Sequence, residues 1–90
     1  MKECHKLILQ RRTLELVKNL QPQPLLLYLY QKEIINQDDM DEVRSKKIRR
    51  DACLALISKL MLKGPEAFPE LVEGLQQNQP FLACSLLKEG

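Results

Sequence analysis

Leucine and other apolar residues recur at steps of three and four along nearly the whole chain, in short stretches interrupted by proline and glycine. This spacing places apolar side chains on one face of an α-helix, so it predicts a series of short amphipathic helices. Ninety residues bury only one core of useful size. We therefore predict a single all-α domain over residues 1–90, built as a six-helix antiparallel bundle.

The composition supports helices over strands. The chain has no Trp, only two Phe and two Tyr, and its apolar residues are mostly Leu. Packed helices use such residues, whereas strands favour Val, Thr and aromatics. The continuous apolar run over residues 25–30 is also compatible with a buried strand. A helix over residues 24–33 is preferred because no other segment offers a strand to pair with it.

The first helix is expected over residues 3–20. Its apolar stripe lacks a member at Arg11 and Arg12, where we expect a bend or a change of buried face. The proline-rich segment over residues 21–24 should end it, because proline disfavours helical geometry in the residue before it. The predicted stripe consists of Cys4, Leu7, Ile8, Leu14, Val17 and Leu20.

Further helices are expected over residues 38–45 and 48–63. Gly64-Pro65-Glu66 should start the fifth helix, with proline near its first position, and Asn78-Gln79-Pro80 should open the last, which ends near Gly90. Pro69 is expected to distort the first turn of the fifth helix or to delay its start. The helix over residues 48–63 should bury Ala52, Cys53, Leu56, Ile57, Leu60 and Met61. The last should bury Phe81, Leu82, Leu86 and Leu87, with Cys84 on the same stripe.

Charged residues separate by segment. The candidate basic patch consists of Arg11, Arg12, Lys46, Arg49 and Arg50, and the candidate acidic patch of Asp38, Asp39, Asp41 and Glu42. A surface with one basic and one acidic face can dock head-to-tail on copies of itself or on relatives. The alternative is a solvated surface with no partner, and helix-start positions alone explain Asp38 and Asp39.

Several other functions are disfavoured. A net charge of +2 is weak for nucleic-acid binding, although the segment Lys46 to Arg50 keeps that alternative open. No apolar run approaches the roughly 20 residues that cross a bilayer, so no membrane partner is expected. Three scattered cysteines favour reduced thiols in the cytosol or the nucleus. Neither a catalytic site, a metal site nor a cofactor is expected, and Cys4 beside His5 is a minor alternative for a metal or catalytic pair.

Three stretches carry a family resemblance. They are Leu14 to Leu20 (LELVKNL), Leu29 to Ile35 (LYQKEII), and Arg49-Arg50-Asp51 followed by an apolar helix and Gly64 to Pro69 (GPEAFP). In this order they resemble the caspase recruitment domain (CARD) of the death-fold superfamily. The prodomains of initiator caspases and the CARDs of caspase-recruiting adaptors are the most similar members. The resemblance implies a CARD-type death fold with a bent first helix.

The resemblance also implies a function. CARDs pair with other CARDs through a basic and an acidic patch, which implies a cytoplasmic module that recruits or clusters caspases in apoptotic or inflammatory signalling. An initiator-caspase prodomain is the first expectation, with an adaptor or a nucleotide-binding oligomerisation protein as the alternative. Self-assembly is compatible with both. The chain departs from apoptosome-recruited caspase prodomains at Thr13, where they carry a basic residue, and at Leu54, one helical turn after Arg50.

Overall fold

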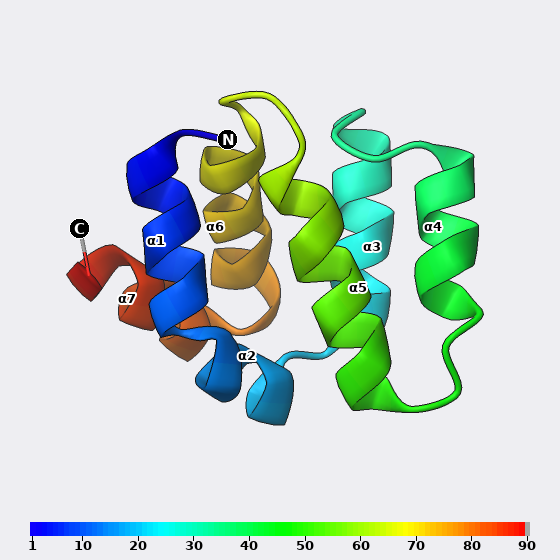
Figure 1. The fold of residues 1–90 in the computed structure, drawn as a ribbon, viewed down its shortest axis with the longest axis horizontal. Helices are drawn as coiled ribbons and strands as arrows, with labels where there is room; N and C mark the ends of the chain where they lie inside the picture. Colours follow the sequence, from blue (N-terminus) through cyan, green and yellow to red (C-terminus); the bar gives the residue numbers. More distant parts are fainter. Residues whose placement is uncertain (90) are drawn as a thin grey trace.

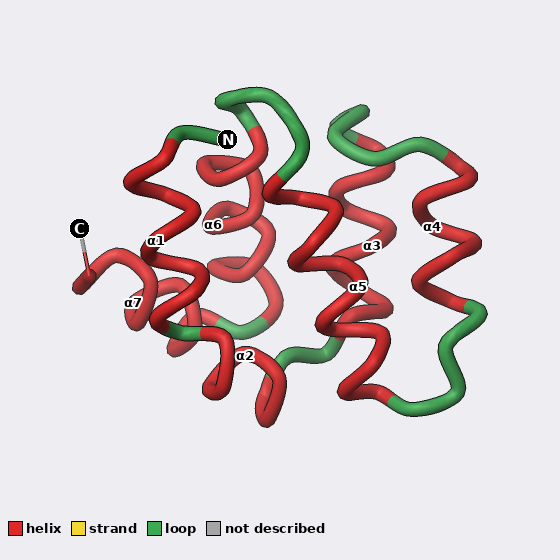
Figure 2. Tube along the Cα trace, viewed as in Figure 1, coloured by secondary structure: helices red, strands yellow, loops and turns green. Residues whose placement is uncertain are grey.

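Helices make up most of residues 1–89, the part of the chain that the computed structural model describes, and no strand occurs among them (Figures 1 and 2). The predicted six-helix count is corrected to seven within this part. The helices are α1 (Glu3–Arg11), α2 (Thr13–Asn19), α3 (Pro22–Gln31), α4 (Gln37–Arg44), α5 (Arg49–Met61), α6 (Ala67–Asn78) and α7 (Pro80–Glu89).

The additional helix arises because the predicted first helix breaks at Arg12. This residue has φ −102° and ψ 8°, outside helical geometry. The hydroxyl of Thr13 donates to the carbonyl oxygen of Leu9 at 2.7 Å. Such bonds to the carbonyl four residues back bend helices. The sequence therefore predicted the position of the irregularity, and the structure shows two helices there.

The longest helix, α5, lies at the centre of the bundle. It packs against α2, α3, α4 and α6, while α1 and α7 pack against each other on the opposite side from α4 (Figure 1). The core between the helices is apolar, and none of the described residues buries a polar or charged side chain. Helices α4 and α5 are antiparallel neighbours: Asp39 at the start of α4 pairs with Lys59 and Lys63 near the end of α5, and the basic start of α5 follows the end of α4 (Figure 1).

Four prolines lie in first turns: Pro22 and Pro24 of α3, Pro69 of α6 and Pro80 of α7. Helix α3 begins at Pro22, two residues before the predicted start, and includes Pro24 in its first turn. Pro65 and Glu66 lie in a turn, and helix α6 begins at Ala67 with Pro69 as its third residue, so the regular helix starts two residues after Pro65. The first amides of a helix have no partner within the helix, so proline removes no bond there. The apolar run over residues 25–30 is helical.

The buried faces match the prediction best in α5. Ala52, Cys53, Leu56, Ile57 and Leu60 are all buried, and Met61 is partly buried. At the two ends of the chain the prediction was partly wrong. The residues expected inside that are exposed are Cys4, Leu7, Leu14, Phe81, Cys84 and Leu87. Helices α1 and α7 lie at the edge of the bundle, so each buries a narrower face.

Helices α3 and α6 approach closely at Gly74. A Cβ atom on Gly74 would lie 2.7 Å from Cδ1 of Leu25 and 2.9 Å from Cδ1 of Tyr28. Real side chains do not pack at such distances, so any larger residue would force the side chains of Leu25 and Tyr28 to move. The close approach lets α3 pack tightly on α6, and both helices also contact α5, which begins with the candidate basic residues Arg49 and Arg50.

Candidate functional site

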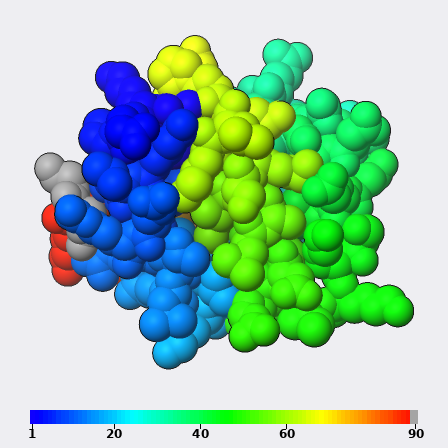
Figure 3. Space-filling view, viewed as in Figure 1, coloured from blue at the N-terminus to red at the C-terminus, as the bar shows by residue number. Residues whose placement is uncertain are grey.

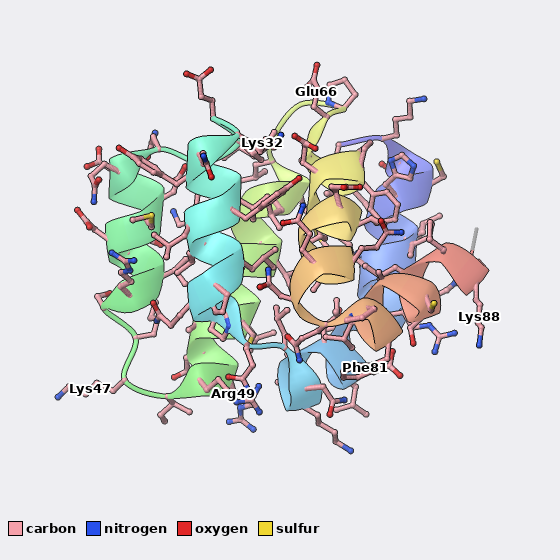
Figure 4. The ribbon with its side chains drawn as sticks, turned by 180° about the vertical axis from the view of Figure 1, so that it is seen from behind. Lys32, Lys47, Arg49, Glu66, Phe81 and Lys88 are labelled. Carbon is pink, nitrogen blue, oxygen red and sulfur yellow. The ribbon has the colours of Figure 1, made fainter. Side chains whose placement is uncertain are left out.

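The segment between α4 and α5 forms a protruding basic corner. Lys46, Lys47 and Ile48 are exposed there, and Ile48, in extended geometry, immediately precedes the first residue of α5. Figure 4 shows Lys47 pointing away from the body of the molecule, and the same segment is the green projection at one corner of Figure 3. Positive charge at a convex corner is accessible to a partner.

Arg49 turns back onto the protein. Its Nη1 donates to the carbonyl oxygen of Leu20 and its Nη2 to that of Lys18, each at 2.7 Å. The last carbonyls of a helix lack partners within the helix, and a guanidinium satisfies them well. Arg49 therefore joins the start of α5 to the end of α2 (Figure 4). Two of its donors are thereby committed within the fold.

The junction that Arg49 closes has further bonds. The side-chain amide of Gln79 makes two of them. Its Nε2 donates to the carbonyl oxygen of Asn19, and its Oε1 accepts from the backbone N–H of Gln21, each at 2.7 Å. Cys53 contributes a thiol that donates to the Leu20 carbonyl at 3.5 Å. Burial raises the pKa of Cys53 and outweighs the opposite effect of the nearby Arg49. Cys53 is thus a buried, protonated packing residue.

Arg50 lies on the exposed side of α5. Leu54, one helical turn later on the same helix, is 40% exposed, so the two side chains share one outer ridge. The sequence had singled out Leu54 as a departure from related domains. The structure places that departure on the surface beside Arg50.

The remaining predicted basic residues lie at the junction of α1 and α2. Arg11 is exposed at the end of α1, and Arg12 is partly buried at the break before α2. Helix α2, which follows Arg12, packs against both α1 and α5. The assignment of all five basic residues to one docking surface stays a prediction.

The predicted acidic residues all lie in α4, but they are not equivalent. Asp38, Asp41 and Glu42 are exposed. Asp39 forms a capping box with Asn36. The backbone N–H of Asp39 donates to the Asn36 side chain at 2.8 Å, and the backbone N–H of Asn36 donates to the Asp39 carboxylate at 3.2 Å. Asp39 therefore starts the helix as well as carrying charge.

Asp39 also connects α4 to α5. Its carboxylate lies 2.7 Å from Nζ of Lys63 and 3.2 Å from Nζ of Lys59, and Lys59 also lies 3.3 Å from Glu42. Burial alone would raise the pKa of Asp39, but the bonds from Lys63, Asn36 and Lys59 outweigh it and lower that pKa. With Asp39 enclosed, the accessible acidic surface reduces to Asp38, Asp41 and Glu42.

The partner lysines were missed by sequence reasoning. Lys59 and Lys63 are 20 and 24 residues from Asp39 and have no local signal that pairs them with it. Only the packing of α4 on α5 brings these groups together. An open pocket of about 660 Å³ lies beside this contact, and its lining includes Tyr30, Glu33 and Lys63. The ammonium group of Lys63 is already paired with Asp39, so the pocket is not taken as a binding site.

The minor Cys4–His5 alternative gains no support from the local geometry. His5 stacks on Phe68 with ring centroids 4.1 Å apart and an angle of 13° between the rings, and Cys4 is exposed. No group of three or more potential metal ligands occurs among residues 1–89. Within the same part of the chain, no helix has the length and apolar character needed to span a membrane.

Comparison with known proteins supports the family resemblance of the sequence. The family model for the caspase recruitment domain (CARD) matches residues 6–89, nearly the whole chain. No curated protein matches it. The matched region contains all seven helices except the first residues of α1, and it includes both charged surfaces described above.

Proposed function

The chain belongs to the caspase recruitment domain family, and we propose that it is the prodomain of an initiator caspase, docking onto another CARD. Domains of this family act by homotypic protein interaction in apoptotic or inflammatory signalling. The family match over residues 6–89 is the observation that carries the docking function. The choice of an initiator-caspase parent is supported by the resemblance at Arg49-Arg50-Asp51 and at Gly64 to Pro69. The function proposed for this domain is recruitment in the cytoplasm, without catalysis of its own.

Two exposed surfaces support docking. The basic surface comprises Lys46, Lys47 and Arg50 at the start of α5, and the acidic surface comprises Asp38, Asp41 and Glu42 on α4. Complementary charge steers association and sets the register of a complex. Arg50 is the strongest candidate because its planar guanidinium binds carboxylates through two bonds, which a lysine cannot do.

An adaptor or a nucleotide-binding oligomerisation protein is the alternative parent. The same family match supports it, because CARDs occur in such proteins as well. The discriminating observation is the sequence of the full-length protein beyond the domain: a protease domain supports the caspase, and a nucleotide-binding module supports the scaffold.

Nucleic-acid binding is a lower alternative, favoured only by the exposed Lys46 and Lys47 at the basic corner. It is tested by titrating labelled duplex DNA at several salt concentrations. Binding whose affinity falls steeply with salt would support it, since phosphate contacts release counterions.

The docking proposal is tested with Arg50→Glu. Recombinant CARDs of caspases, adaptors and scaffolds are immobilised as a panel, and binding of the native and variant chains is compared. We expect Arg50→Glu to cost at least about 2 kcal/mol, roughly thirtyfold in affinity, as central interface residues do. Circular dichroism should show unchanged helix content, because Arg50 is exposed.

Lys32→Glu is the matched control. Lys32 is exposed at the end of α3, and its substitution by Glu changes the net charge by as much as Arg50→Glu does. It should bind the panel as the native chain does. If the native chain and Arg50→Glu bound equally well, Arg50 would not be part of the docking surface. If Arg50→Glu and Lys32→Glu lost the same affinity, the loss would be due to the change in net charge and not to the position of Arg50.

A further inference from the structure

The outer ridge of α5 changes character along its length. Four residues spaced four apart lie on it and are exposed: Arg50, Leu54, Ser58 and Leu62, the last at the end of the helix. Leu54 is 40% exposed and Leu62 86%. The ridge is therefore basic at its start and partly aliphatic beyond it. A partner that covers Arg50 also covers Leu54, one turn away.

The outer surface of α4 has no such aliphatic part. Its two apolar residues, Met40 and Val43, are 4% and 0% exposed and belong to the core. The exposed residues of this helix and its C-cap are Gln37, Asp38, Asp41, Glu42, Arg44 and Ser45. Helix α4 thus offers carboxylates to a cation but has no exposed apolar side chain of its own.

The α5 ridge and the outer surface of α4 are therefore complementary in charge at Arg50 but not in polarity at Leu54. If the α5 ridge docked on α4 of a second copy, Arg50 would gain a carboxylate, but Leu54 would displace water from neighbouring carboxylates. Removing water from a charged group without supplying a new bond is unfavourable. The same contact would be favourable if the partner placed an aliphatic side chain opposite Leu54.

We propose that Leu54 is a specificity-determining residue, which directs the α5 ridge to a non-identical CARD whose acidic surface includes an exposed aliphatic side chain. Leu54 disfavours docking of the ridge on a second copy of the chain. Discrimination of this kind combines an attraction to one partner with a mismatch against another. The inference rests on the proposed function, because it assumes that the α5 ridge is a docking surface.

The test uses two acceptor variants of the chain itself. Both carry Arg50→Glu, which disables their own α5 ridge, and one also carries Asp41→Leu, which supplies an aliphatic side chain on α4. Asp41 is exposed, and its one side-chain hydrogen bond is from Gln37 at 2.8 Å. Circular dichroism establishes that both acceptors are folded before binding is measured.

The donors are the native chain, Leu54→Ala and the control Leu27→Ala. Leu27 is 55% exposed on α3, so its truncation removes a similar side chain elsewhere. The native donor and the control should bind the Asp41→Leu acceptor about tenfold more tightly than the other acceptor, whereas Leu54→Ala should bind both equally. This pattern isolates the contact between positions 54 and 41.

Three outcomes would overturn the inference. They are equal binding of the two acceptors by the native donor, the same preference in Leu54→Ala, and self-association of the native chain that Arg50→Glu abolishes. Light scattering of the native chain measures the last. The CARD panel tests the proposed function separately: a partner that depends on Arg50 upholds docking even if the Leu54 inference fails.

Discussion

At the scale of single residues, Arg49 and Arg50 show that adjacent arginines can differ in what they bind. Arg49 donates to the carbonyls of Leu20 and Lys18, whereas Arg50 lies on the outer ridge of α5. Their sequence context is nearly identical, and both were predicted to belong to a basic patch. The distinction depends on where the end of α2 lies relative to the start of α5.

Arg49→Ala should therefore lower the free energy of unfolding. Two charged donors would be lost and two helix-end carbonyls would face water, which costs about 1–2 kcal/mol at this partly exposed position. Arg50→Ala, the control, should change stability little, since Arg50 is exposed. Urea unfolding followed by circular dichroism measures both. Equal stability of the two variants would contradict the role of Arg49 at the junction.

At the scale of elements, α4 is held by its first turn. Asp39 caps the helix with Asn36 and pairs with Lys59 and Lys63 of the α5 region. Asp38, its neighbour, is exposed and lacks these contacts among the hydrogen bonds and ion pairs of residues 1–89. The position of α4 on the bundle thus depends on one of two adjacent carboxylates.

Asp39→Ala should destabilise the protein by about 1–2 kcal/mol, the usual cost of losing a helix cap with a partly buried ion pair. Hydrogen exchange should show the largest loss of protection in α4. Asp38→Ala serves as the control and should leave exchange in α4 nearly unchanged. Greater exchange in α1 than in α4 would show that Asp39 does not secure this helix.

The elements also differ in how well the sequence predicted them. In α5 the apolar stripe is continuous and the helix is surrounded by others, so periodicity identified the buried face. Leu7, Leu14, Phe81 and Leu87 lie on edge helices, where an apolar residue at helical spacing can still be exposed. Their exposure depends on which neighbours cover them, and the sequence does not state that.

For the candidate surfaces, the sequence located the charges but not their availability. Charge runs are visible in any sequence, so Asp38 to Glu42 and Lys46 to Arg50 could be found. The internal use of Asp39 and Arg49 depends on groups 20 to 31 residues away along the chain. Such pairings follow from the packing of α4 and α2 on α5.

At the scale of the whole molecule, His5 couples stability to pH. Burial against the protein, with Lys2 and the N-terminal ammonium nearby, lowers the pKa of His5 from its ordinary value of 6.5. Its Nδ1 is buried without a hydrogen-bond partner. The unfolded chain therefore binds a proton more readily than the folded chain below pH 6.5, and acid favours unfolding there.

We expect the free energy of unfolding to fall as the pH drops from 7.5 through 6.5 and to level off for His5 below its folded pKa. His5→Phe, which can still stack on Phe68, should flatten this part of the profile. The free energy of unfolding should fall a second time as the pH drops through 3.8. The folded protein lowers the pKa of Asp39 from that value, so acid protonates this carboxyl more readily in the unfolded chain. Urea unfolding at a series of pH values gives the profile, and an unchanged slope in His5→Phe would contradict the role of His5.

The apolar core has an evolutionary consequence. No described residue places a charged side chain or a strongly polar one in it, and the thiol of buried Cys53 makes only a weak hydrogen bond to the Leu20 carbonyl. Cores of this kind tolerate exchanges among aliphatic residues when volume is kept. Away from the close contact at Gly74, aliphatic exchanges in the interior should therefore leave the fold in place, whereas exchanges on the outer ridges of α4 and α5 change the proposed docking surfaces.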